Sequence, residues 1–457
     1  MRLQQKEPYK VKSVKWSNPV QYTPFFAYRH ERQRPPREKA LHCEGVSLEH
    51  VASVVGTPAY VYSRHSIEAA YRQLDGAFGS LPHTLCYSVK ANSNLAVLSL
   101  LAKLGSGFDI VSGGELDRLQ RIGVPGRRIV FSGVGKSRDE IREAIRYPGK
   151  GKGPGGILLF NAESEEELEV LLSEAARRVG PGGAPTPAAL RINPDVLAGG
   201  HSHISTGHHS HKFGLGWHDA RCLYLAHKDS RWIVWRGITA HIGSQIVTMS
   251  PFRHALMRLS SHVRELARHD IRLDYLDLGG GLGIRYTHET PLEPLAYARA
   301  LSAIIRPLGC RLILEPGRTL VGPAGVLLTR VLYVKENRGK TFVIVDAAMN
   351  DLIRPVLYHA THPITKVIVQ SAGSAQKRPV DVVGPICESG DFLGRDWPLD
   401  AVKSGDLLVV WATGAYGFVE SSNYNSRPRP PEILVEGQRF RVIRRRQTFK
   451  DLVRGEC

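Results

Sequence analysis

Thr84-Leu85-Cys86-Tyr87-Ser88-Val89 is a short, mostly apolar run of sequence that ends directly before Lys90. Such a run is typical of a parallel strand buried on both faces between helices. A charged side chain at the end of a buried strand is costly unless the structure uses it. In a pocket, the pKa of a lysine can fall from ~10.4 toward neutrality, which makes the amine a nucleophile. A surface lysine at a strand-to-helix turn is the simpler interpretation of one residue, so the choice depends on the other strand ends.

Seven further apolar runs of the same kind follow the first, and segments with helical signals lie between them. The eight predicted strands cover residues 84–89, 107–111, 128–131, 157–160, 189–192, 237–241, 275–278 and 311–314. Ser137-Arg138-Asp139-Glu140 and Ser164-Glu165-Glu166-Glu167 have the pattern of capping boxes at helix starts. Eight alternations of strand and helix predict an α/β fold built on a (β/α)8 barrel of the TIM type.

After Gly322 the pattern changes to strand-like runs that are separated by turns, with little helix. These runs cover residues 326–334, 341–346, 364–370, 380–383, 406–412 and 432–443. They predict a β-rich C-terminal domain, which the strand-like segment 59–63 is expected to join. The predicted parts of the chain are a basic, irregular extension (1–40), a segment contributing to the β domain (41–68), the barrel (69–322) and the β-rich domain (323–457). Residues 22–36 are expected to be polar and irregular.

The composition is that of a globular protein and narrows the function mainly by exclusion. Of the 457 residues, 42% are hydrophobic and 23% charged, and no apolar run is long enough to cross a membrane. Residues 1–40 lack the apolar core of a secretory signal. The six cysteines are scattered without a CxxC pair, which favours a reducing compartment, the cytoplasm, over a disulfide framework or zinc ribbon. The formal charge of +18 comes from dispersed basic residues and fits an anionic substrate or cofactor as well as nucleic acid.

Polar or charged residues follow every predicted barrel strand, at the end where (β/α)8 barrels carry their chemistry. In chain order they are Lys90; Asp109 and Ser112; Ser132; Asn161 and Glu163; Arg191 and Asn193; His241 and Ser244; Gly279-Gly280-Gly281; Glu315 and Arg318. These residues predict an active site, because they place a lysine, an imidazole, a carboxylate and a glycine run on one ring of loops. The glycine run lacks the spacing of a dinucleotide fingerprint, because Ile284 stands where the third glycine would be. At the seventh strand its amide groups are expected to bind a phosphate.

Three further groups of residues lie outside this ring. One is the set His201, His203, His208, His209 and His211. These histidines lack helical spacing and a supporting carboxylate, so a pocket-lining loop is favoured over a metal site. Arg354 and Tyr358 stand one helical turn apart, a pairing that suits a carboxylate. Cys387 and Glu388 are adjacent, which by itself indicates little.

Taken together, the motifs resemble those of the fold-type III pyridoxal-phosphate-dependent decarboxylases, group IV, and most closely the members that act on diaminopimelate. The matching stretches are residues 87–92, 107–115, 191–195, 201–214, 241–244, 279–281, 315–318, 387–389, 414–417 and 424–428. The resemblance covers the chain from about Leu41 to its end. It implies a barrel joined to a β-rich domain, in the two-domain plan of alanine racemase.

The resemblance implies pyridoxal 5′-phosphate as the cofactor and no metal. Lys90 would hold the cofactor's aldehyde as a Schiff base, Glu315 would keep the pyridine nitrogen protonated, and His241 would stack on the ring. The glycine run and Ser244 would hold the phosphate. The residues implied in cofactor binding are Lys90, Asp109, Arg191, His241, Ser244, Gly279, Gly280, Gly281, Glu315, Pro316, Gly317, Arg318 and Tyr416.

The implied reaction is the decarboxylation of meso-2,6-diaminopimelate to L-lysine and CO2, the last step of lysine biosynthesis. Substrate contacts are implied for Arg318, Arg354, Tyr358, Glu388 and Tyr416. The two arginines, helped by Tyr358, would bind the distal carboxylate, and Glu388 would take the distal ammonium. Cys387 would donate the proton that replaces CO2. Family analogy places Cys387 and Glu388 in the active site of a partner subunit, which implies a homodimer.

Alternatives to this function stay open. A related decarboxylase acting on ornithine, lysine or arginine would share part of the motif set, although the two arginines, Tyr358 and Glu388 favour diaminopimelate. A racemase on the same two-domain plan would need a second catalytic base. A non-enzymatic carrier of pyridoxal phosphate would leave the residues after Gly322 without a purpose. A nucleic-acid role is suggested only by charge and has no motif behind it.

Overall fold

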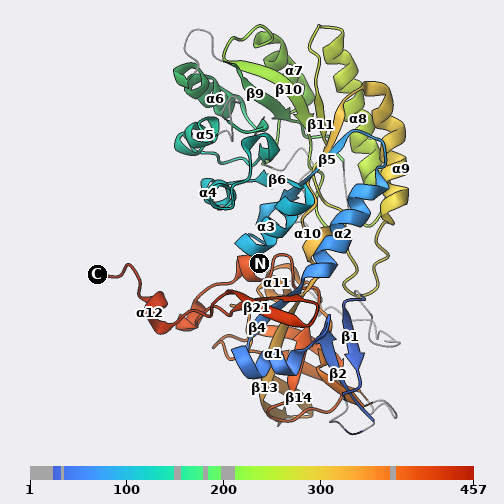
Figure 1. The fold of residues 1–457 in the computed structure, drawn as a ribbon, viewed down its shortest axis with the longest axis vertical. Helices are drawn as coiled ribbons and strands as arrows, with labels where there is room; N and C mark the ends of the chain where they lie inside the picture. Colours follow the sequence, from blue (N-terminus) through green and yellow to red (C-terminus); the bar gives the residue numbers. More distant parts are fainter. Residues whose placement is uncertain are drawn as a thin grey trace, which may run out of the picture.

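The computed structural model describes residues 24–31, 35, 37–148, 156–178, 184–196, 212–370 and 377–457. A ring of strands surrounded by helices occupies the upper part of Figure 1, and a β-rich unit lies below it. Within the described residues, no helix is long and apolar enough to span a membrane.

The upper unit is a closed barrel of eight strands, each paired in parallel with its two neighbours. The strands are β5 (His83–Ser88), β6 (Gly107–Ile110), β7 (Ile129–Phe131), β8 (Leu159–Ala162), β9 (Thr186–Arg191), β10 (Ile233–Thr239), β11 (Tyr275–Asp277) and β12 (Arg311–Leu314). The ring closes where β12 pairs with β5. This confirms the predicted (β/α)8 barrel, with strand boundaries that differ from the prediction by a few residues.

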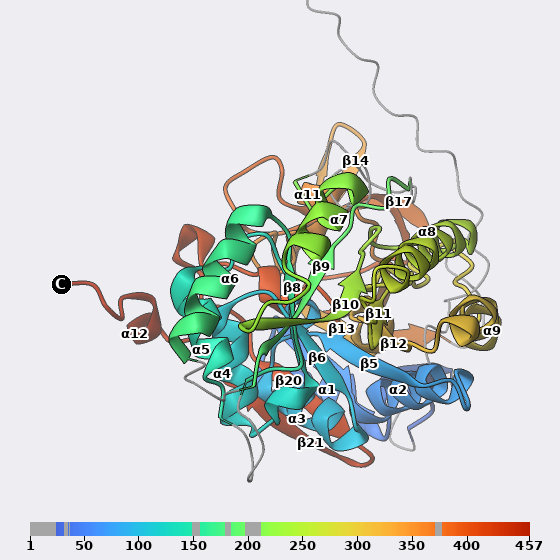
Figure 2. The same ribbon diagram turned by 90° about the horizontal axis from the view of Figure 1, so that it is seen from above.

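Helices form an outer layer around these strands, as Figure 2 shows from above. They are α2 (Arg64–Ala77), α3 (Leu95–Leu104), α4 (Gly113–Arg121), α5 (Arg138–Ile145), α6 (Glu165–Arg178), α7 (Trp217–Ala226), α8 (Ser250–Ala267) and α9 (Pro294–Ile305). The predicted capping box opens α5, since Ser137 accepts from the amide of Glu140 and Glu140 bonds back. Small and medium side chains fill the barrel interior: Cys86, Val130, Leu159, Ala189 and Ile313.

The lower unit is dominated by a nine-stranded sheet whose main path runs β18-β17-β14-β13-β4-β20-β21. Off this path, β19 pairs with β13, and β15 pairs with β19. Its strands are β4 (Ala59–Ser63), β13 (Gly325–Asn337), β14 (Lys340–Val345), β15 (Ile364–Lys366), β17 (Arg378–Val383), β18 (Phe392–Leu399), β19 (Leu407–Val410), β20 (Glu432–Glu436) and β21 (Arg439–Arg444). The strand predicted over 59–63 is β4, which pairs with β13 and β20 as expected. Short helices accompany these strands: α1 (Leu48–Val55), α11 (Arg354–Tyr358) and α12 (Phe449–Leu452). Another short helix, α10 (Arg318–Val321), follows the last barrel strand and packs on α2.

A second, four-stranded sheet corrects the prediction for the N-terminal region. It contains β1 (Phe26–Arg29), β2 (Glu38–Cys43), β3 (Val46–Ser47) and β16 (Ile368–Gln370). The irregular structure predicted over residues 22–36 is therefore wrong for Phe26–Arg29. Burial of Phe26, which packs edge-to-face on Trp411 at 5.7 Å between ring centroids, gives this polar stretch its hydrophobic anchor.

Sequence patterns also missed one strand of the large sheet. β18 (Phe392–Leu399) carries Arg395, Asp396 and Pro398, residues that are unfavourable in a central strand. The strand lies at the edge of the sheet path, where a proline without an amide hydrogen is tolerated. Residues 392–399 can form a strand because they lie at the sheet edge, and the local sequence does not reveal that position.

The two units meet where β5 ends. The amide of Tyr416 donates to the carbonyl of Ala91 at 2.9 Å, and the side-chain amide of Asn92 donates to the carbonyl of Gly414 at 3.1 Å. A Cβ at Gly414 would overlap the carbonyl oxygen of Val321, so only glycine allows this close approach. The contact holds Tyr416 beside Lys90.

We expect Gly414→Ala to lower the free energy of unfolding by about 1–3 kcal/mol, because the added methyl group must push the two units apart. Urea denaturation followed by circular dichroism measures this change. Gly76→Ala is the matched control, since a Cβ at Gly76 in α2 meets nothing within 4 Å. Equal denaturation midpoints for Gly414→Ala and the wild type would contradict the packing argument.

Candidate active site

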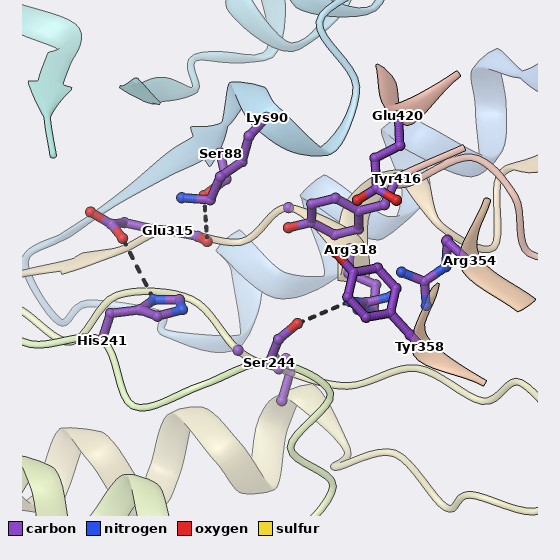
Figure 3. Close-up of a pocket in the computed structure, with 13 residues that line it drawn as sticks. Ser88, Lys90, His241, Ser244, Glu315, Arg318, Arg354, Tyr358, Tyr416 and Glu420 are labelled. Carbon is purple, nitrogen blue, oxygen red and sulfur yellow. Dashed lines mark hydrogen bonds and ion pairs between the residues drawn. The ribbon is translucent and has the colours of Figure 1, made fainter. Parts of the chain in front are cut away.

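A pocket opens at the carboxyl ends of the barrel strands, where they face the β-rich unit. The barrel lines it with Ser88, Lys90, His241, Ser244, Gly281, Leu282, Glu315, Gly317 and Arg318, and the β-rich unit with Arg354, Tyr358, Tyr416 and Glu420. Figure 3 shows Lys90, Glu315 and His241 at one end and Arg354, Tyr358 and Glu420 at the other. Six residues of the predicted ring of strand ends therefore line one cavity: Lys90, His241, Ser244, Gly281, Glu315 and Arg318.

Lys90 lies in a short 3-10 turn, Val89–Ala91, that continues β5. Its Nζ donates to Oδ2 of Asp109 at 3.0 Å, and Asp109 is fully buried at the end of β6. Burial alone would lower the pKa of Lys90, but Asp109, Glu315 and Tyr416 outweigh it and raise the pKa above its usual value. The lowered pKa that the sequence suggested is thus wrong for the protein alone, because acidic neighbours hold the ammonium form.

Three buried carboxyl groups surround the base of the pocket. Glu315 has a strongly raised pKa because of its burial and the nearby charges of Asp109 and Asp277. Burial, partly offset by a hydrogen bond from the amide of Gly279, also raises the pKa of Asp277, to about 7. Three negative charges this close together are unfavourable, so the cluster retains protons at neutral pH.

His241 follows β10 and stands next to these acids. The amide of Gly280 donates to His241 Nδ1 at 3.1 Å, so Nδ1 carries no proton. Burial, together with the charges of Arg191 and Lys90, lowers the pKa of His241 well below its usual value. The imidazole is therefore neutral, and its 3.9 Å approach to Glu315 is not an ion pair. A neutral ring can pack against a flat aromatic ligand without the cost of a buried charge.

The backbone of the glycine run 279–281, which follows β11, packs closely against the residues that follow β10 and β12. A Cβ at Gly280 would overlap the carbonyl oxygen of Glu315, and one at Gly281 would lie 2.5 Å from the carbonyl oxygen of Gly243. Gly281 also has φ +100°, a conformation that other residues rarely adopt. Of the three glycines, Gly281 is the one that lines the pocket, while the amides of Gly279 and Gly280 are engaged by Asp277 and His241.

Two buried arginines form the cationic part of the pocket. Arg318 Nη2 donates to Ser244 Oγ at 2.9 Å, and its guanidinium lies 4.8 Å from the ring centroid of Tyr416. Arg354 donates to His362 Nε2 at 3.2 Å, and both arginines reach the hydroxyl of Tyr286. Among the described residues, Arg318 Nε has no hydrogen-bond partner although it is buried. Buried guanidinium groups of this kind suit an anionic ligand.

Other predicted site residues lie outside the lining of this pocket. Arg191 pairs with Glu163 at 2.8 Å, and its guanidinium packs on the ring of Phe213. Cys387 is exposed, with its thiol 3.3 Å from Oδ1 of Asn425. Its neighbour Glu388 accepts a hydrogen bond from the hydroxyl of Tyr424. The histidines predicted between 201 and 211 lie outside the described residues.

Sequence reasoning missed several residues of the site. Asp277 ends β11 and could have been found by the strand-end rule that found its neighbours. Tyr286 lies in the loop between β11 and α9, nine residues after the strand, and Glu420 lies in the β-rich unit; no local pattern marks either residue. They reach the site only because loops from distant parts of the chain converge there.

The comparisons with known proteins agree with this geometry. Residues 64–322 match the family model described as "Pyridoxal-dependent decarboxylase, pyridoxal binding domain". The diaminopimelate decarboxylase of Pseudomonas aeruginosa is 48% identical over 92% of this chain and 97% of its own length, and that of Neisseria meningitidis serogroup B is 45% identical over 91% and 97%. The structure of Helicobacter pylori diaminopimelate decarboxylase complexed with L-lysine is 39% identical and has a TM-score of 0.83, covering 89% of this chain and 98% of its own.

The residues present fit pyridoxal phosphate. The pocket offers an amine at Lys90, a protonated carboxyl at Glu315, a neutral imidazole at His241 and an unpartnered Arg318 Nε beside Gly281. Aldehyde, ring nitrogen, ring face and phosphate each have a counterpart of suitable chemistry. With the family model covering more than half of the chain and relatives matching almost all of it, the chain belongs to the fold-type III pyridoxal-dependent decarboxylases, and among them to the diaminopimelate decarboxylases.

Proposed function

We propose that this protein decarboxylates meso-2,6-diaminopimelate to L-lysine and CO2, the last step of lysine biosynthesis. One observation carries the proposal: buried Arg318 and Arg354 share a pocket with Lys90, so a second carboxylate can be held at a distance from the reacting amine. A site built for that carboxylate rejects ornithine and other substrates that lack it. The names of the relatives and the lysine complex of the Helicobacter pylori enzyme support the same substrate.

When bound, pyridoxal phosphate supplies the electron sink that decarboxylation needs. We assign Lys90 as the residue that binds its aldehyde covalently, with Asp109 orienting the amine. The buried carboxyl of Glu315 holds a proton that it can share with the ring nitrogen, and neutral His241 covers the ring face. We assign Ser244, Gly281 and Gly317 to the phosphate end, and Arg318, which donates to Ser244, to the position between that end and Arg354. Gly279, Gly280, Pro316 and Arg191 are proposed to support the cofactor from outside the pocket lining.

At the opposite end of the pocket, Arg354, Tyr358 and Tyr416 contact the substrate. Cys387 and Glu388 lie on the surface, held by Asn425 and Tyr424, and do not line the pocket of their own chain. We infer that they complete the pocket of a second copy in a homodimer, Cys387 as proton donor and Glu388 as a partner for the distal ammonium.

In this scheme residues 69–322 bind the cofactor, and 41–68 and 323–457 form the β-rich domain. The free cysteines fit a cytoplasmic enzyme.

The substrate panel is the first test. Purified holoenzyme should release CO2 from meso-diaminopimelate and not from ornithine, arginine or lysine. Arg354→Met should lower kcat/KM for diaminopimelate by roughly 10- to 100-fold, because a charge-assisted hydrogen bond contributes about 1.5–3 kcal/mol. Arg253→Met, an exposed arginine on α8, is the control. Release of CO2 from ornithine alone would assign the protein to the related decarboxylases instead.

Asp109 should control the pH dependence of cofactor loading. Only the neutral amine of Lys90 reacts, so its raised pKa means that the loading rate of the wild type keeps rising into the alkaline range. Asp109→Asn removes the largest opposing charge, which lowers the pKa and makes the rate level off at lower pH. Visible absorbance after mixing apoprotein with pyridoxal phosphate from about pH 6.5 to 10 measures this. Asp117→Asn, exposed on α4, is the control, and identical profiles for Asp109→Asn and wild type would refute the role of Asp109.

Mixing two inactive variants tests the shared site. Lys90→Ala and Cys387→Ala should each lose turnover, and a mixture that exchanges subunits should recover about a quarter of wild-type activity. Half of its dimers then contain both variants, and one of their two sites has both residues intact. If Cys387 served the pocket of its own chain, or if the protein stayed monomeric by light scattering, the mixture would remain inactive.

A further inference from the structure

We propose that Glu420 determines specificity by accepting the ammonium of the substrate's distal amino-acid head, opposite the arginines that hold the carboxylate of the same head. This inference rests on the proposed function and adds a residue from the same chain as Arg354. It differs from the role of Glu388 of the partner subunit, which can share the three hydrogens of the same ammonium.

Glu420 closes a short 3-10 turn, Phe418–Glu420, that follows the glycine-rich loop touching the barrel. Its side chain lines the same pocket as Lys90, and Figure 3 shows the carboxyl group on the side of Tyr416 and Arg354. Because Tyr416 is tied by its amide to Ala91, the contact between the two units also sets the position of Glu420. Glu420 is therefore a positioned pocket residue and not a free surface carboxylate.

One carboxyl oxygen of Glu420 is unsatisfied. Oε2 is buried and, within the part of the chain that the structure describes, has no hydrogen-bond partner. A buried oxygen without a donor is costly, and such atoms in a binding pocket mark the place of a ligand group. Burial also raises the pKa of Glu420, against the opposing charges of Arg354 and Arg318.

The relation of Glu420 to the arginines matches the chemistry of the ligand. The carboxyl group lies within electrostatic reach of both guanidinium groups, yet no ion pair joins them among the described residues. The distal head of diaminopimelate carries an ammonium and a carboxylate on one carbon. An acid and a pair of arginines that line one pocket without pairing with each other can bind both groups at once.

A structural role is the simpler alternative, in which Glu420 only balances the charge of the arginines. That role would be served best by direct ion pairs, which the arrangement lacks. The arginines instead contact Tyr286, Ser244 and His362. The open side of Glu420 is thus left for a cation from outside the chain.

Turnover of two substrates tests the proposal. Glu420→Gln keeps the shape of the side chain and removes its charge. The variant should lower kcat/KM for meso-diaminopimelate by roughly 10- to 100-fold, mainly through KM, as expected for a lost charge-assisted hydrogen bond. With 2-aminopimelate, which has the distal carboxylate but no distal ammonium, variant and wild type should agree within about two-fold. Glu166→Gln, exposed on α6, is the matched control.

Binding without turnover separates this proposal from the proposed reaction. L-Lysine retains the distal head, and 6-aminohexanoate is the same molecule without the α-ammonium. Calorimetry on the holoprotein should show that Glu420→Gln lowers the affinity for L-lysine and leaves the affinity for 6-aminohexanoate unchanged. Equal losses for both ligands, or no loss for either, would overturn the role of Glu420. A further outcome is that the wild type releases no CO2 from diaminopimelate while Glu420→Gln still weakens the binding of L-lysine alone. That result would contradict the proposed reaction and still support the ammonium site at Glu420.

Discussion

The ion pair between Lys90 and Asp109 sets the charge state of the whole pocket floor. Asp109 is fully buried, and it contributes to the raised pKa values of Lys90, Glu315 and Asp277 alike. Burial and neighbouring charges raise the pKa values of Glu315 and Asp277, so these carboxyls favour their protonated forms. Burial, with the charges of Arg191 and Lys90, lowers the pKa of His241. The charge pattern of the pocket floor thus comes from burial together with this pair and its charged neighbours.

The second constraint is the contact between the two units. Gly414 and Tyr416 touch the turn that carries Lys90, and the same loop continues into Glu420. The nucleophilic end of the pocket therefore belongs to the barrel and most of the selective end to the β-rich unit. The proposed selectivity draws on both units, because Arg318 belongs to the barrel and Arg354 to the β-rich unit. A displacement at this contact would alter both the fit of the substrate and the surroundings of the lysine.

The division of roles also explains why the surface pair Cys387 and Glu388 stands apart from the pocket. The thiol of Cys387 contacts Asn425, and the carboxyl group of Glu388 accepts from Tyr424, on the surface of the β-rich unit. Ordered reactive groups that do not line the pocket of their own chain support the proposal of a shared site. In the proposed scheme, Glu420 gives each chain its own acid at the distal head, and Glu388 of the partner subunit adds a second acid when the proposed dimer forms.

Local sequence determined the elements of the barrel and most of the ring of residues at its strand ends. Short apolar runs, capping boxes and glycines act within a few residues, so strands such as β5 and site residues such as His241, Glu315 and Arg318 could be predicted. Strand β1, edge strand β18, Tyr286 and Glu420 could not, because their roles depend on neighbours far along the chain. Lys90 shows the same limit. Its position could be predicted from the strand that precedes it, but its raised pKa could not. Burial lowers that pKa, and the charges that raise it come from residues that only the folded chain brings together.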